Sequence, residues 1–95
     1  MADRQTFIES AQADLRETQA RIDKLGERAD DVSKDARVSF QNCLQEARAH
    51  QDEAQRNLDK LKASGDEAWD ELKSDFQSVR ADLRESVEQL AGQFE

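Results

Sequence analysis

Three side chains in the middle of the sequence have the types and spacing that could bind a metal ion. Cys43, Glu46 and His50 are separated by three and four residues, so on a helix a thiolate, a carboxylate and an imidazole fall on one face. Zinc and iron sites need three or four converging ligands, and the chain holds one Cys and one His. We therefore predict no metal site. Cys43 is expected to pack as a small apolar residue, and His50 to take an edge or polar position that helps to set helix register.

Covalent catalysis by Cys43 would require an activating base and an oxyanion pocket. No segment of the sequence supplies such a pocket, and the many carboxylates are expected on exposed helix faces rather than in a cleft. The sequence contains no glycine-rich phosphate loop, no CxxC pair and no HExxH motif. We therefore expect a protein that is not an enzyme, with no catalytic residues and no cofactor.

The composition indicates long helices. The 95 residues include no Pro, no Tyr and three Gly, and 38% of them are charged, which is typical of chains built from strong helix formers. The net charge of −8 disfavours binding to nucleic acid and to anionic lipid. No apolar window approaches the length of a membrane span, and membrane association is not expected. A single Cys does not suggest an oxidising compartment, so we expect a cytoplasmic location.

Apolar and small residues recur with helical spacing along most of the chain. In the N-terminal half they follow a heptad pattern from Ile8 to Cys43, which is typical of a coiled coil. From Leu61 to Phe94 the spacing changes to an eleven-residue repeat, which favours straight or slightly right-handed packing. We predict that the helix-packing interface contains Ile8, Leu15, Ile22, Leu25, Val32, Leu61, Leu72, Phe76, Val79, Leu83, Val87, Leu90 and Phe94.

Two capping-box patterns suggest where helices begin. Thr6 is followed three residues later by Glu9, and Ser64 is followed three residues later by Glu67. In such a pair the two side chains satisfy backbone N–H groups that the first turn of a helix leaves free. Gly65 lies beside the second pattern, so we place a turn there.

The fold that we favour is all-α: a long helical hairpin forming one coiled-coil domain over residues 1–95. The long helix covers about residues 4–62, the turn about 63–66, and a shorter antiparallel helix about 66–94. The long helix would extend roughly 90 Å, so the shorter one covers only its nearer half. An antiparallel homodimer would cover the remainder and complete a three-helix coiled-coil cross-section.

A second fold is compatible with the same stripe. Gly26 and the acidic residues up to Asp35 weaken helix propensity, and a bend there would close the same contacts within one molecule as a three-helix bundle. The two forms are related by domain swapping. We favour the dimer because the apolar stripe continues through residues 29–36.

The segment DEAQRNLDKLKASGDEAWDELK, residues 52–73, resembles a family of small bacterial coiled-coil proteins associated with stress responses. Its most distinctive part is ASGDEAWDELK, residues 63–73. The resemblance implies a cytoplasmic, non-enzymatic protein with no catalytic residues to transfer. We therefore expect a structural or protein-interaction role, with a homodimer as the favoured assembly and a protein client as a further partner. The alternative is a reversible lipid-surface or client-protein binder that uses its amphipathic apolar stripe.

Overall fold

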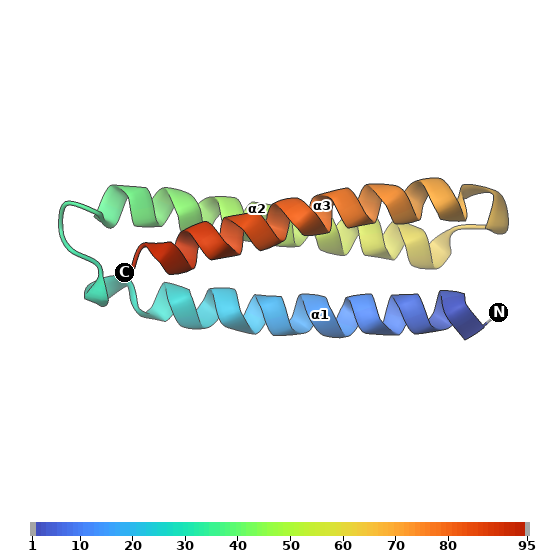
Figure 1. The fold of residues 1–95 in the computed structure, drawn as a ribbon, viewed down its shortest axis with the longest axis horizontal. Helices are drawn as coiled ribbons and strands as arrows, with labels where there is room; N and C mark the ends of the chain where they lie inside the picture. Colours follow the sequence, from blue (N-terminus) through green and yellow to red (C-terminus); the bar gives the residue numbers. More distant parts are fainter. Residues whose placement is uncertain (1, 95) are drawn as a thin grey trace.

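Three long helices and one short 3₁₀ helix form an elongated rod in the computed structural model, which describes residues 2–94. α1 (Ala2–Glu27) is followed by η1 (Ala29–Asp31), α2 (Arg37–Ala63) and α3 (Asp66–Gly92). α1 and α3 run in the same direction and α2 runs in the opposite one (Figure 1), within a rod of 51 × 18 × 17 Å. The prediction of an all-α fold with a helical hairpin is confirmed, and α2 and α3 form that hairpin.

The connector between α1 and α2 corrects the predicted continuous helix of residues 4–62. α1 ends at Glu27 and α2 begins only at Arg37. Asp is a weak helix former, and in a continuous helix Asp31 and Asp35 would lie one turn apart and repel each other. The chain therefore bends in the segment for which the sequence analysis gave a bend as the less favoured of two folds.

Local hydrogen bonds hold the connector in its bent form. The Nε of Arg28 donates to the carboxylate of Asp31 at 3.2 Å, and the backbone N–H of Ala36 donates to the carbonyl of Ser33 at 3.1 Å. Val32 is only 3% exposed and closes this end of the core. The bend returns α2 along α1, so one chain supplies the three-helix cross-section, and each helix is about 40 Å long at 1.5 Å per residue.

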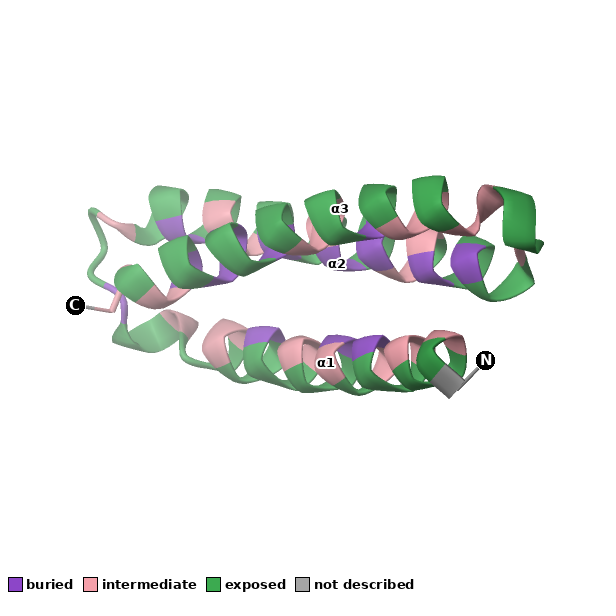
Figure 2. Ribbon diagram, turned by 45° about the vertical axis from the view of Figure 1, so that its right-hand side comes forward, coloured by how far each residue is buried: buried purple, intermediate pink, exposed green. Residues whose placement is uncertain are grey.

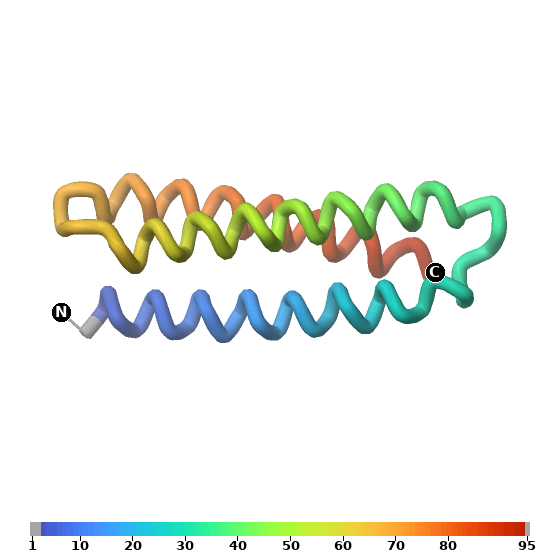
Figure 3. Tube along the Cα trace, turned by 180° about the vertical axis from the view of Figure 1, so that it is seen from behind, coloured from blue at the N-terminus to red at the C-terminus, as the bar shows by residue number. Residues whose placement is uncertain are grey.

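The turn predicted at about residues 63–66 is present at the other end of the rod (Figure 3). The predicted capping boxes are not. The hydroxyl of Ser64 donates to the carbonyl of Leu61 at 2.8 Å and so ends α2, while Gly65, which has no side chain to offer, is the N-cap of α3. Thr6 lies inside α1, which already includes Ala2. Both patterns failed because the helices begin two to four positions from where the hydroxyl side chains stand.

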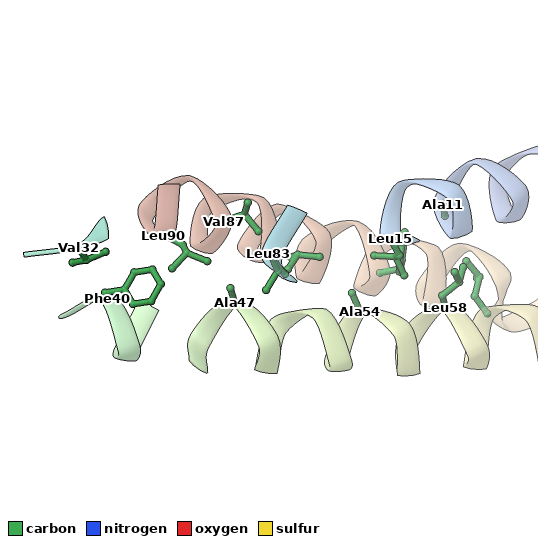
Figure 4. Packing of buried hydrophobic residues seen from close by; sticks show 13 residues of the cluster. Ala11, Leu15, Val32, Phe40, Ala47, Ala54, Leu58, Leu83, Val87 and Leu90 are labelled. Carbon is green, nitrogen blue, oxygen red and sulfur yellow. The ribbon is translucent and has the colours of Figure 1, made fainter. Parts of the chain in front are cut away.

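The core is a line of apolar side chains along the inner edges of the three helices. Buried and half-buried positions face inward on each helix and exposed positions face outward (Figure 2). Figure 4 shows this line from Val32 and Phe40 at one end to Leu58 and Ala11 towards the other. The buried apolar residues are Ala11, Leu15, Ile22, Val32, Phe40, Ala47, Ala54, Leu58, Leu61, Phe76, Leu83, Val87 and Leu90.

Candidate functional site

The residues with metal-binding potential do not converge. Cys43 is half-buried and packs against the core, Glu46 is exposed, and the ring of His50 points to Ser86 of α3. Within residues 2–94 no group of three or more His, Cys, Asp or Glu side chains is arranged to hold a metal ion. Within the same residues no helix carries an apolar stretch that could cross a lipid bilayer.

Among residues 2–94, the contact between His50 and Ser86 resembles part of a catalytic site. The Nδ1 atom of His50 and the hydroxyl of Ser86 share a hydrogen bond of 2.6 Å, as a base and a nucleophile would. Ser86 is only 5% exposed and lies in the middle of α3, where backbone N–H groups are already bonded along the helix and cannot form an oxyanion hole. The arrangement is suited to joining α2 to α3 through a polar contact.

Gln51, the next residue along α2, makes the equivalent contact to α1. Its amide Nε2 donates to the carbonyl of Leu15 at 3.0 Å, and the residue is 5% exposed. Its Oε1 is buried without a hydrogen-bond partner, which costs about 1–3 kcal/mol. Together, His50, Gln51 and Ser86 form a polar layer across an apolar core. The side-chain pair of His50 and Ser86 penalises other registers of α2 against α3, because a shift by one turn would separate the two groups.

The predicted helix-packing residues lie along the inner faces of the bundle, with different degrees of burial. Those that are buried are Leu15, Ile22, Val32, Leu61, Phe76, Leu83, Val87 and Leu90. Those that are half-buried and pack against the core are Leu25, Leu72, Val79 and Phe94. Ile8 is half-buried near the start of α1.

α2 contributes buried residues that were not predicted. Phe40, Ala47 and Ala54 are all fully buried, and together with Leu61 they recur every seventh residue. The predicted heptad of α1 continues to Cys43. Cys43 is three residues out of phase with the buried repeat of α2 that begins at Phe40. The change of phase between α1 and α2 was the signal in the sequence that could have located these core residues.

Polar contacts between α1 and α2 lie beside their shared apolar core. The guanidinium of Arg48 lies 3.0 Å from the carboxylate of Asp23. The amide of Gln12 donates to Gln55 at 3.1 Å and its oxygen accepts from Lys62 at 2.8 Å. Such exposed contacts contribute little to stability, because water competes for the same groups.

α1 and α3 are joined near both ends of the bundle and by one ion pair at mid-length, where the Nε of Arg80 lies 2.7 Å from the carboxylate of Asp14. At one end the ring of Phe7 packs edge-on against Trp69 and Phe76, at centroid distances of 5.9 and 6.0 Å. At the other end the guanidinium of Arg28, just after α1, lies 4.4 Å from the ring centre of Phe94. Over their whole length α1 and α3 are the least closely packed of the three pairs of long helices.

The arrangement as a whole is a helix-packing surface: a closely packed hairpin with a third helix laid against it. Comparisons with family models, with curated proteins and with solved structures found no match to this chain. The unequal packing of α1 and of the hairpin is the feature on which a function can be argued.

Proposed function

We propose that the protein is a non-catalytic helix-packing module that acts by binding other helices, first of all those of a second copy of itself. The supporting observation is unequal packing: α2 and α3 share most of the interhelical contacts, α1 has fewer with α2, and fewest with α3. Segments with fewer buried contacts open at a lower free energy than the rest of a protein. α1 is therefore the helix that leaves, and its departure exposes the apolar stripe of the hairpin to another helix.

The sequence of the connector supports exchange of α1 between copies. Core-facing positions continue at steps of three or four residues from α1 through residues 28–36 into α2. The pattern departs from heptads by one extra four-residue step, which a continuous coiled coil absorbs by local unwinding. Every position of the series is buried or half-buried: residues 11, 15, 18, 22, 25, 29, 32, 36, 40, 44, 47, 51, 54, 58 and 61. A straightened connector would carry α1 onto the hairpin of a second copy as an antiparallel, domain-swapped homodimer.

Two connector variants test this exchange in opposite directions. Lys34 follows Ser33 at the first central position of the turn that ends at Ala36, a position that suits Pro. Lys34→Pro keeps the bend and prevents a continuous helix. Asp31→Ala removes the ion pair with Arg28, and in a straight helix it also removes repulsion between Asp31 and Asp35.

The measurement is the molar mass by light scattering after size-exclusion chromatography, over a range of loading concentrations. We expect the unmodified chain, of 10.8 kDa, to show a dimer fraction that rises with concentration. Asp31→Ala should increase that fraction and Lys34→Pro should abolish it, with unchanged helix content by circular dichroism. A monomer mass for all three proteins at every concentration would refute exchange, and so would a dimer that survives Lys34→Pro.

The non-catalytic character is part of this proposal. It is supported by the use of the Ser86 hydroxyl as a contact between α2 and α3 and by the absence of a free N–H pair around it in mid-helix. A double variant, Cys43→Ala with His50→Gln, should keep the helix content and the helix binding of the protein, because a Gln amide can also hydrogen-bond the hydroxyl of Ser86. Loss of a measured activity in this variant, with unchanged helix content, would instead support the hypothesis that the protein is an enzyme.

Binding to a lipid surface is a separate candidate, and co-sedimentation with vesicles distinguishes it. The acidic chain, with its net charge of −8, should be repelled by anionic headgroups. We expect no sedimentation with neutral or anionic vesicles, whereas a client protein helix would bind the opened hairpin. Sedimentation with either kind of vesicle would favour the lipid-binding alternative.

The cellular setting that we propose is bacterial stress physiology, and its support is the resemblance of residues 52–73 described above. Removal of the gene should reduce survival after stress and leave unstressed growth unchanged. Equal survival with and without the gene would exclude this role.

A further inference from the structure

Gln51 is a buried polar residue in the middle of the face that α2 turns to the core. It lies between Ala47 and Ala54, which are both fully buried. The larger Phe40 and Leu58 are also fully buried and lie nearer the two ends of α2 (Figure 4). The middle of α2 therefore offers the core two methyl groups and one amide, where the ends of the helix offer large apolar side chains.

The amide of Gln51 is only half satisfied while α1 is in place. Its Nε2 donates to the carbonyl of Leu15 at 3.0 Å, and its Oε1 is buried without a hydrogen-bond partner. Leu15 lies inside α1, so its carbonyl already accepts a backbone hydrogen bond from the next turn of the helix. Loss of the Gln51 contact would therefore leave no backbone group of α1 unpaired.

Departure of α1 would satisfy the whole amide. With α1 gone, water reaches the side chain of Gln51 and pairs with both of its polar atoms. The unpaired Oε1 therefore raises the free energy of the closed bundle and not that of the open one. The contact between His50 and Ser86 joins α2 to α3 and remains when α1 leaves, so Gln51 is the member of the polar layer that responds to opening.

We propose that Gln51 determines how readily α1 leaves the hairpin, because it keeps the closed bundle less stable than an apolar residue at this position would. This inference rests on the proposed exchange of α1 and assigns a residue that regulates it. The amide acts as a release device in the centre of the α1–α2 contact.

The same geometry separates the speed of exchange from its equilibrium. In a domain-swapped dimer, α1 of one copy packs on α2 of the other through the contacts of the closed monomer. Gln51 then meets Leu15 in both forms, with the same unpaired Oε1. Replacing Gln51 should leave the monomer–dimer equilibrium unchanged and slow the approach to it, because either form must open before α1 can change places.

Hydrogen exchange of the α1 amides, followed by nuclear magnetic resonance, measures opening in the monomer and requires no dimer. Gln51→Met keeps an unbranched side chain and removes both polar atoms. Gln51→Leu is a second apolar variant of different shape, which serves if Met packs poorly. Gln45→Met is the matched control, because Gln45 is exposed on the same helix.

We expect the protection of the α1 amides to rise at least about tenfold in a Gln51 variant, which corresponds to removal of one unpaired buried acceptor. Gln45→Met should leave protection within about twofold of the unmodified chain. A rise in either Gln51 variant supports the proposal. Unchanged or reduced protection in both variants, with well-dispersed spectra that show folded proteins, would overturn it.

The decay of a purified dimer after dilution, followed by size-exclusion chromatography, tests the effect on exchange. The unmodified chain and Gln51→Met should reach the same final dimer fraction, and Gln51→Met should take at least about ten times longer. A decay that Gln51→Met does not slow would overturn the role of Gln51 and leave the exchange of α1 intact. If no dimer formed in any of the proteins, exchange would be refuted, and the protection of the α1 amides would still decide whether Gln51 controls opening.

Discussion

α1, α2 and α3 are nearly equal in length, at 26, 27 and 27 residues, but α1 is packed very differently from the α2–α3 hairpin. The hairpin buries large side chains from both of its helices, including Phe40, Leu58, Phe76 and Leu90. α1 buries Leu15 and Ile22 together with the small Ala11, and its other contacts include weak polar bridges and an aromatic contact near its start. The contrast shows that a continuous helical pattern does not guarantee uniform stability, because the free energy comes from the size of the buried side chains.

The largest expected effect comes from removing an aromatic ring from the hairpin. Phe40 is fully buried and packs edge-on against Phe94 at 5.5 Å. Phe40→Ala should lower the free energy of unfolding by about 3–5 kcal/mol, as measured by urea denaturation, and should reduce amide protection in all three helices. Val38→Ala, at a position that is 73% exposed, should change stability by less than about 0.5 kcal/mol. Equal effects of the two substitutions would mean that the hairpin core is not where the structure places it.

A substitution of a buried leucine in α1 tests whether α1 is held less firmly than the hairpin. Leu15 is fully buried, and Leu15→Ala should cost about 2–4 kcal/mol. Amide exchange should accelerate mainly in α1 while α2 and α3 stay protected, because α1 opens without the hairpin. Arg16→Ala, at the exposed neighbouring position, is the control. Equal loss of protection in all three helices would show that α1 and the hairpin unfold as one unit.

The polar layer gives a smaller effect. Ser86→Ala removes the hydrogen bond to His50, which should cost about 0.5–1.5 kcal/mol. The better helix propensity of Ala offsets a few tenths of this. Ser78→Ala makes the same substitution at an exposed position of α3 and should be neutral or slightly stabilising. The difference between the urea midpoints of the two variants measures how much the His50–Ser86 contact stabilises the hairpin. Equal midpoints would show that the contact does not stabilise it.

The smallest expected effect concerns a close approach between α1 and α2. A Cβ atom added at Gly26 would lie 3.3 Å from the Nη2 of Arg48 and 3.5 Å from the Cδ1 of Leu44. The end of the Arg48 side chain can move aside, so Gly26→Ala should stabilise α1 by about 0.5 kcal/mol through helix propensity. Gly92→Ala, with no neighbour within 4 Å, is the control without a packing cost. If Gly26→Ala destabilised the protein, the close approach of α1 and α2 would require a residue without a side chain at this position.

Several features of the fold were readable from particular residues. The absence of Pro and the abundance of charged helix formers predicted helices, and the spacing of Leu72, Phe76, Leu83 and Leu90 predicted the inner face of α3. Ala63 to Asp66 predicted the turn. These features depend on neighbours within a few residues, so local sequence determines them.

The capping boxes and the packing of α2 were not predictable in the same way. Ser64 has a hydroxyl suited to an N-cap, yet it bonds back to Leu61, because the chain must turn sharply to bring α3 onto α2. Cys43 continues the heptad of α1, yet Phe40 takes the buried position, because the bend resets the orientation of α2. Distant segments contribute in both cases: the guanidinium of Arg4 donates to the hydroxyl of Ser64 at 3.3 Å, and Phe40 packs against Phe94.

The sequence by itself determined an all-α chain with an apolar stripe that must be covered, because helix propensity and periodicity are properties of near neighbours. Only the tertiary structure decided how the stripe is covered: by bending at residues 28–36 and by pairing His50 with Ser86. The physical reason is that a straight and a bent connector bury the same stripe. The choice between them depends on small local terms and on contacts between residues far apart in the chain.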